Sequence, residues 1–199
     1  DVPGFHSLPD FMNSPVSDDI YVRWTQFGVF SSHIRYHGTS KREPWSYPAI
    51  ASIVKKWWKL RYALIPYIME QSEKATRTGY PVLRALIFHH PEDKLCWHID
   101  DEYYFGDDFL VAPVMNGEGC RDVYLPKGEW VNFFTGECFE GECWLKKVDV
   151  PLEEMPVYVR KGATIPMYPE EVDCTDEMDL SKSILVKIDD AYRGFWADR

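Results

Sequence analysis

The sequence predicts a chain in two parts, helical before about residue 80 and built of antiparallel strands after it. Two stretches in the first part carry apolar residues at helical spacing. The second part consists of short apolar runs separated by Gly, Pro and Asp, which is the pattern of an antiparallel sandwich or barrel. Hydrophobic residues make up 45% of the 199 residues, enough to build a packed core.

The first helix is predicted from about Asp18 to Phe30, after a loop-like opening that contains several prolines. Ser17 is a suitable N-cap for it, and acidic residues occupy its first turn. Ile20, Trp24, Phe27 and Ser31 follow one another at helical spacing, and the apolar residues among them form the stripe of this helix.

A second helical stretch begins near Tyr47 and ends at Gly79. Pro66 should kink it, because proline lacks an N–H and clashes with the preceding turn. Its stripe consists of Ile50, Ile53, Val54, Trp57, Leu60, Leu64 and Ile68.

The strands are predicted from apolar runs that end at turn residues. A hairpin turn is expected at Asp107-Asp108, directly after Gly106. The runs are PVLRALIFHHP (81–91), DDFLVAPVM (107–115), CRDVYLP (120–126), EWVNFF (129–134), VYVRKGATIPM (157–167) and SILVKI (183–188).

Charge and cysteine content narrow the range of partners. The formal net charge is -10, and an acidic chain repels phosphate, so nucleic acid is not expected as a partner. No apolar run approaches the roughly 18 residues of a membrane span. The five cysteines include no C-x-x-C pair, which disfavours a disulfide framework or a zinc site. Reduced thiols are typical of the cytosol, so a cytoplasmic location is expected.

The run His89-His90-Pro91-Glu92-Asp93 contains residue types that bind metals. Adjacent histidines on a strand point to opposite faces, however, and cannot easily share an ion. A turn at the end of a strand is the favoured interpretation, and no metal or cofactor is predicted.

Eight blocks in sequence order resemble glycoside hydrolase family 31, which contains retaining α-glucosidases and α-xylosidases. The similarity runs from residue 1 to about residue 167. The blocks are DVPGF (1–5), YVRWTQFGVFSSHIRYHG (21–38), EPW (43–45), LRYALIPYIME (60–70), GYPVLRALIFHHPED (79–93), YYFGDDFLVAPV (103–114), VYLPKGEWVNFFTGE (123–137) and PVYVRKGATIPM (156–167).

The resemblance implies an α/β plus all-β fold, the C-terminal part of a (β/α)8 barrel followed by an antiparallel β-sandwich domain. Residues 1–80 would end the barrel, residues 81–168 would form the proximal β-sandwich domain, and residues 169–199 would start the distal β-domain. Both helical stripes would then be covered by strands upstream of this chain, which we interpret as a fragment. The loops DVPGF and SSHIRYHG would lie at the C-terminal end of the barrel, where such enzymes place the active site.

The resemblance assigns substrate binding to four side chains in these loops. His37 would hydrogen-bond sugar hydroxyls, since imidazole can donate and accept. Arg35 would hold nearby aspartates ionised and aligned. Asp1 would support the charge and hydrogen-bond network, and Phe5 would line the pocket wall. From the residues alone, a plain loop histidine, a structural ion pair and core packing remain alternatives for His37, Arg35 and Phe5.

Other polar and aromatic residues of the second loop are interpreted as its support. This group comprises His33, Glu43 and Trp45. An Arg42–Glu43 pair could also hold the loop, but an exposed pair contributes little.

The predicted function is that of a fragment of a retaining α-glycosidase that hydrolyses terminal α-linked xylose or glucose from oligosaccharides. Retention needs two carboxyl groups about 5 to 5.5 Å apart, and in this family both are aspartates upstream of DVPGF. No catalytic residue is therefore assigned here, and the fragment alone should be inactive. The loop SSHIRYHGTSKREPW slightly favours α-xylosidase. The alternatives are a non-catalytic carbohydrate-binding module and a purely structural module, and a homo-oligomer of the full-length enzyme stays open.

Overall fold

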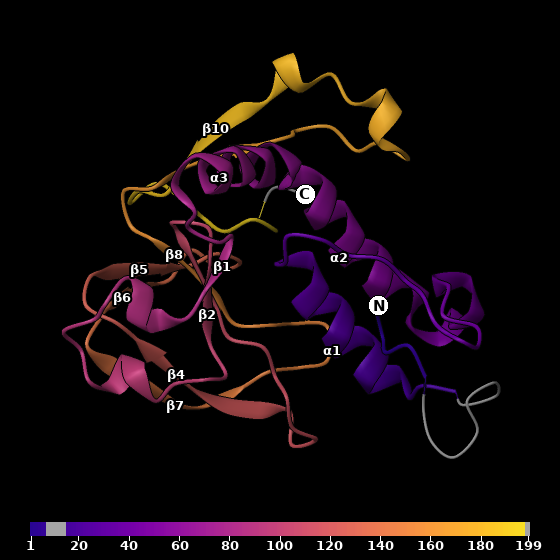
Figure 1. Cartoon of the computed structure of the whole chain (residues 1–199), viewed down its shortest axis with the longest axis horizontal. Helices are drawn as coiled ribbons and strands as arrows, with labels where there is room; N and C mark the ends of the chain where they lie inside the picture. The colour runs from indigo at the N-terminus through magenta and orange to yellow at the C-terminus, as the bar shows by residue number, and fades with distance from the viewer. Residues whose placement is uncertain (7–14, 198–199) are drawn as a thin grey trace.

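Helices α1 (Asp18–Val29), α2 (Ala51–Ala63) and α3 (Ile65–Thr78) fill the first part of the chain in the computed structural model (Figure 1). The structure describes residues 1–6 and 15–197, and the loop expected around Pro9 lies outside them. Short 3-10 turns, η1 (Pro44–Ser46) and η2 (Pro48–Ile50), lead into α2. The predicted positions of both helical stretches are confirmed.

The second helical stretch is broken into two helices at Leu64, which joins α2 to α3. Pro66 lies in the first turn of α3, where its missing N–H would have had no helical partner. Gly79 ends α3 with a φ of 77°, a left-handed conformation that glycine adopts without strain. The predicted interruption at Pro66 and stop at Gly79 are both confirmed.

The second part of the chain is built of strands, and every pairing between the described strands is antiparallel. The largest sheet has the order β1-β2-β3-β8-β5-β6, while β4 pairs with β7 and β9 with β10. Gly106 starts the predicted turn between β2 and β3 with a φ of 65°. The strands are β1 (Leu83–Arg84), β2 (Tyr103–Phe105), β3 (Phe109–Val111), β4 (Cys120–Leu125), β5 (Glu129–Asn132), β6 (Cys138–Glu140), β7 (Cys143–Asp149), β8 (Val157–Arg160), β9 (Thr164–Met167) and β10 (Ile184–Lys187).

Strands β2, β6 and β7 were not expected from the sequence. Strands β2 and β6 have only three residues each, and most residues of β7 are half-buried or exposed. Strand β2 is buried at Tyr104 and Phe105, whereas β7 lacks the continuous apolar run that signals a buried strand.

The six-stranded sheet has a different apolar layer on each face. Because neighbouring strand residues point to opposite faces, Phe109 and Val111 of β3 join the helices in one core, whereas Leu110 joins a second core with residues of β4. Figure 1 shows α3 and the β4–β7 ribbon on opposite sides of this sheet. The helices therefore cover one face and the ribbon covers the other.

The apolar stripe of α2 and α3 is covered within this chain. Trp57 is 1% exposed and Leu60 is fully buried, in the same core as Phe105 and Phe109. The Tyr67 ring lies edge-on to Phe109, with ring centroids 5.1 Å apart. The expectation that upstream strands cover this stripe is thus wrong for α2 and α3, because the chain's own sheet fills that position.

Helix α1 behaves differently from the other two. Its Tyr21 and Val22 are buried against Ile50 and Val54. Trp24 belongs to the stripe predicted as the packing face, and it is 42% exposed. The face of α1 that this chain buries therefore runs through Tyr21, Val22 and Val29 and not through the predicted stripe.

The described residues contain no helix that is both long and apolar enough to cross a membrane. The five cysteines are free thiols. The division of the chain near residues 80 and 168 stays a prediction.

Candidate substrate-binding site

The segments Asp1–Phe5 and Arg35–Thr39 lie side by side and run parallel. Val2 and Tyr36 form a parallel bridge. The Val2 N–H donates to the Arg35 carbonyl at 2.8 Å, and the His37 N–H donates to the Val2 carbonyl at 3.2 Å. Val2 is buried, whereas Asp1, Arg35 and His37 are exposed. The alternation of an extended chain thus gathers these three polar side chains at one surface.

Asp1 is the centre of this polar cluster. Its Oδ1 accepts a hydrogen bond from Arg35 Nε at 2.6 Å and lies 3.2 Å from His37 Nδ1. The Arg35 side chain is 68% exposed, so solvent screens the ion pair and its contribution to stability is small. The ion pair with Arg35 orients the Asp1 carboxylate. Because this carboxylate lies close to His37 Nδ1, it favours the tautomer of His37 that carries the proton on Nδ1.

Phe5 completes the group from the other loop. Its ring centroid lies 5.2 Å from that of His37 at an interplanar angle of 44°. Phe5 is 42% exposed in this chain, and core packing remains an alternative for it. Its carbonyl accepts a hydrogen bond from the Thr39 N–H at 2.8 Å, which ties the two loops together.

The structure therefore brings Asp1, Phe5, Arg35 and His37 into one cluster at the ends of two parallel segments. Their role in binding sugar stays a prediction, and a structural ion pair remains open for Arg35.

Arg42 anchors the second loop, through partners that the sequence did not reveal. It is 2% exposed, and its Nε donates to the Gly4 carbonyl at 2.9 Å. Its own carbonyl accepts a hydrogen bond from the Tyr21 hydroxyl at 2.6 Å. The Arg42 backbone N–H donates to the Glu43 carboxylate at 3.2 Å. The expected exposed pair is thus wrong, because Arg42 points inward to the first loop.

The other residues expected to support the loop contribute less. Trp45 is 79% exposed and does not brace the loop. His33 is exposed, and its Nδ1 lies 3.1 Å from the Ser32 hydroxyl.

Gly38 lets the two loops approach each other closely. A Cβ at this position would lie 2.6 Å from the Phe5 carbonyl oxygen and 2.8 Å from Arg42 Cγ. Real Cβ atoms do not come so close to a backbone oxygen, so a side chain here would push the loops apart. Glycine at this position is a requirement of the cluster geometry.

Arg61 on α2 holds the chain between α1 and the second loop. Its guanidinium donates to three backbone carbonyls, those of Val29, Ser31 and Ser32. Burial lowers the pKa of Arg61 to about 10, so the group is still charged at neutral pH. A buried charged donor that serves three carbonyls fixes the direction in which the chain leaves α1.

His89 and His90 lie outside this cluster. They follow the 3-10 turn η3 (Leu86–Phe88) and not a strand, so the expectation of opposite strand faces is wrong for them. Both reach Tyr104: the His89 ring centroid lies 4.3 Å from the tyrosine ring, and His90 Nε2 lies 2.8 Å from its hydroxyl. Burial, followed by the charge of Arg84, lowers the pKa of His89 to about 4. Among the described residues, no group of three or more potential ligands could hold a metal ion.

An α/β-barrel enzyme has parallel neighbouring segments that are joined by a helix, and its polar side chains gather where the segments end. Residues 1–71 match the family model described as the TIM-barrel domain of glycosyl hydrolases family 31, and residues 79–165 match that of the family's C-terminal domain. The chain therefore belongs to glycosyl hydrolase family 31.

Similar proteins include two curated enzymes and a solved structure. Alpha-glucosidase 2 of Bacillus thermoamyloliquefaciens is 35% identical over 152 residues, 74% of this chain and 19% of that protein. The alpha-xylosidase of Saccharolobus solfataricus is 35% identical over 163 residues, 80% of this chain and 22% of that protein. The dextranase of Flavobacterium johnsoniae in complex with isomaltotriose is 39% identical with a TM-score of 0.73, over 79% of this chain and 20% of that chain. This chain thus spans about a fifth of the length of each.

Proposed function

We propose that this chain is part of a retaining α-glycosidase that removes terminal α-linked xylose or glucose from oligosaccharides. It would supply the last part of the catalytic barrel and the β-domain that follows. The observation that carries the proposal is the cluster of Asp1, Phe5, Arg35 and His37 at the ends of two adjacent parallel segments. Barrel enzymes build their active sites at such ends.

The chemistry of the cluster suits the binding of a sugar. With a proton on Nδ1 facing Asp1, neutral His37 would present Nε2 as an acceptor for a ring hydroxyl. Hydrogen bonds to such hydroxyls strengthen as the oxocarbenium-like transition state forms. Phe5 offers an exposed ring against the apolar CH face of the sugar.

The two carboxyl groups that break the glycosidic bond would come from barrel segments outside this sequence. One would attack the anomeric carbon, and the other would protonate the leaving oxygen and later activate water. In the described cluster the carboxylate is Asp1, which Arg35 and His37 already engage. We therefore assign Asp1 a supporting role.

The finer parts of the proposal concern the sugar, the β-domain and the location of the enzyme. The loop SSHIRYHGTSKREPW favours xylose slightly, while the α-glucosidase and α-xylosidase relatives are equally similar, at 35% identity each. A β-sandwich is supported by the β4–β7 ribbon, which packs across an apolar core from the six-stranded sheet. A cytoplasmic location is supported by free thiols. The substrate partner would be an oligosaccharide, and a homo-oligomer of the full-length enzyme stays open.

The test of this function uses the full-length enzyme that contains this chain. We expect it to release xylose or glucose from aryl α-xylosides or α-glucosides, with the α-anomer as the first product in proton NMR. The 199-residue chain alone should release neither sugar. A β-anomer as first product, or hydrolysis by this chain alone, would overturn the proposal.

A second candidate function is that of a carbohydrate-binding module. It is favoured by Trp97, which is 60% exposed and whose indole N–H donates to the Pro91 carbonyl at 2.9 Å. A ring held in this way at the surface can stack on a sugar. Calorimetry of this chain with xylose, glucose and isoprimeverose distinguishes the two functions. Millimolar binding that Trp97→Ala abolishes would favour the binding module.

A further inference from the structure

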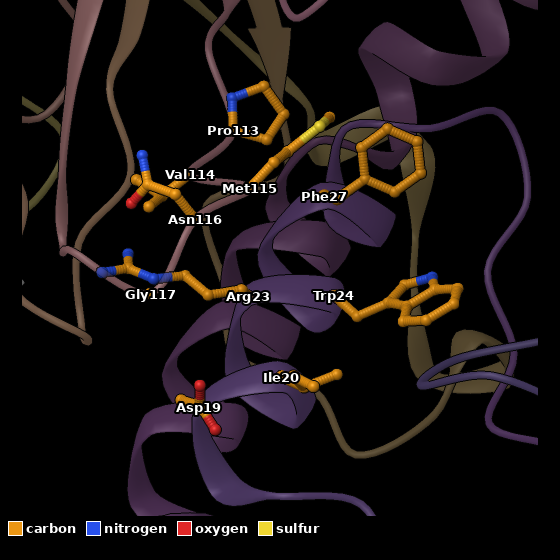
Figure 2. A pocket seen from close by; sticks show the side chains of 10 residues that line it. All are labelled: Asp19, Ile20, Arg23, Trp24, Phe27, Pro113, Val114, Met115, Asn116 and Gly117. Carbon is orange, nitrogen blue, oxygen red and sulfur yellow. The ribbon is translucent and has the colours of Figure 1, made fainter. Parts of the chain in front are cut away.

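The described part of the chain has an apolar hollow between α1 and residues 113–117, with a volume of about 590 Å³. Figure 2 shows Ile20, Trp24 and Phe27 projecting from the same side of α1, with Pro113 and Met115 beyond one end of this row. This is the stripe of α1 that upstream segments are expected to cover. The hollow therefore gives no indication of a ligand, whereas a second cavity of different chemistry does.

The second cavity lies where α2 meets the β-domain and the end of the chain. Its volume is about 230 Å³. Lys56 and Trp57 of α2 line one part of it, while residues after β5, residues between β7 and β8, and Trp196 line other parts. No residue of the candidate substrate-binding cluster lines it. The cavity is thus a separate feature of this chain.

Aromatic rings form the apolar part of the cavity wall. The Phe134 and Trp196 rings are stacked, with centroids 5.9 Å apart and an interplanar angle of 8°. The Trp57 ring lies edge-on to Phe134, with centroids 5.5 Å apart. Because each ring packs on another, the wall keeps a fixed shape against which the apolar CH groups of a sugar can pack.

The indole N–H of Trp57 is a buried donor without an acceptor. Trp57 is 1% exposed, and its Nε1 has no hydrogen-bond partner among the described residues. Buried polar groups are normally paired, and the edge-on Phe134 ring is only a weak acceptor. Because Trp57 lines the cavity, its free donor indicates that a ligand supplies the acceptor.

Charged side chains of both signs line the same cavity without pairing. On the α2 side, Lys56 Nζ lies 4.5 Å from the centroid of the Trp196 ring. On the side of the β-domain, Asp149 and Glu154 are lining residues. Within residues 1–6 and 15–197, none of the charged groups of Lys56, Asp149 and Glu154 forms an ion pair. The cavity therefore offers donors from α2 and acceptors from the β-domain, and a ligand between them must both accept and donate.

Hydroxyl groups meet this requirement, since each can donate and accept a hydrogen bond. A ligand of a single charge would leave the groups of like charge unpaired, which is unfavourable. A purely apolar ligand would leave the Trp57 N–H without an acceptor. A ring that carries several hydroxyls and apolar CH groups suits the donors, the acceptors and the aromatic wall together.

We propose that this cavity is a second sugar-binding site, which holds one neutral pyranose between α2 and the β-domain. Hydroxyl oxygens of the sugar accept from the Trp57 indole N–H and the Lys56 ammonium, and sugar hydroxyls donate to Asp149 and Glu154. The preference for a sugar over an amino acid zwitterion rests on the proposed function, whose products are neutral pyranoses. The site adds to that function, because it retains a sugar on the enzyme outside the candidate substrate-binding cluster.

Fluorine NMR of the full-length enzyme labelled with fluorotryptophan tests the site. The signals of Trp57 and Trp196 are assigned by their absence from Trp57→Phe and Trp196→Phe, and the unaltered enzyme is titrated with glucose or xylose. Both signals should shift along one saturating curve with a millimolar Kd. The Trp97 signal should not follow this curve, because Trp97 lies outside the cavity.

Substitution of a carboxylate in the cavity separates binding there from binding elsewhere. Asp149→Ala should raise the Kd read from the Trp57 signal at least about tenfold, since hydrogen bonds to charged groups are the stronger ones. Glu154→Gln should raise it as well with little change in shape. The control Asp100→Ala removes an exposed carboxylate outside the cavity and should leave the Kd unchanged. All three variants should keep the kcat/KM of the unaltered enzyme on aryl α-xyloside and α-glucoside.

Three results would overturn the site. One is the absence of a shift of the Trp57 and Trp196 signals with either sugar. Another is a shift with glycine but not with sugar, since the ligand would then be a zwitterion. The third is a sugar titration curve that Asp149→Ala and Glu154→Gln both leave unchanged, since the response would then be relayed from another site. An inactive enzyme whose Trp57 signal responds to sugar contradicts the proposed function alone, and an active enzyme whose signals do not respond contradicts this inference alone.

Discussion

Removal of the His37 side chain tests the candidate site most directly. In the full-length enzyme, His37→Ala deletes the imidazole beside Asp1 and the ring that contacts Phe5, whose centroid lies 5.2 Å away. His37 lies at the exposed surface of this chain, with a side chain that is 47% exposed. The substitution should therefore leave the fold intact.

The expected loss follows from the contacts of His37. One net hydrogen bond contributes roughly 0.5 to 1.5 kcal/mol, and a bond to a ring hydroxyl strengthens in the transition state. We therefore expect kcat/KM to fall at least about tenfold, which corresponds to about 1.4 kcal/mol. Because the strengthening belongs to the transition state, kcat should fall together with kcat/KM.

The assay is steady-state hydrolysis of aryl α-xyloside and α-glucoside by the full-length enzyme. The matched control is His33→Ala, which removes an exposed histidine from the same loop whose Nδ1 lies 3.1 Å from the Ser32 hydroxyl. The control should stay near the activity of the unaltered enzyme. Near-normal activity of His37→Ala would refute the assignment of His37, and equal losses in both variants would show that the loop as a whole had been disturbed.

Three further predictions concern the geometry and stability of the chain. Gly38→Ala should lower kcat/KM in the full-length enzyme, because its Cβ would lie 2.6 Å from the Phe5 carbonyl oxygen. The control Gly117→Ala, which has open space around its Cβ, should leave kcat/KM unchanged. Equal effects of the two substitutions would contradict the steric argument. Arg61→Met should lower the free energy of unfolding of this chain in urea by about 3 kcal/mol, because three carbonyls lose a charged donor; a change near zero would contradict the anchoring role. Burial raises the pKa of Glu102 to about 7, so the folded state binds the carboxyl proton more tightly than the unfolded state does. The free energy of unfolding should therefore fall as pH rises from about 4.5 to about 7, and it should level off above that. In urea titrations, Glu102→Gln should lack this pH-dependent loss of stability, which is about 3 kcal/mol for a pKa difference of that size. An identical pH dependence of the unaltered chain and the variant would contradict this prediction.

The sequence determined the features of this protein that depend on neighbouring residues. Proline and glycine set local backbone preferences, so Pro66 and Gly79 marked the interruption and the end of the second helical stretch. Gly106 marked the hairpin turn for the same reason. The motif resemblance pointed to the loops of Asp1 and His37, which the structure brings together.

Tertiary structure alone decided which surfaces cover one another. Apolar spacing does not say which surface covers a helix. The chain's own sheet covers the stripe containing Trp57, whereas Trp24 is 42% exposed and α1 packs through Tyr21 and Val22 instead. The sequence did not indicate the backbone partners of Arg42 and Arg61. Their anchoring roles arise because folding buries each guanidinium beside backbone carbonyls distant in the chain. Such contacts depend on the path of the whole chain, and a local pattern carries no information about it.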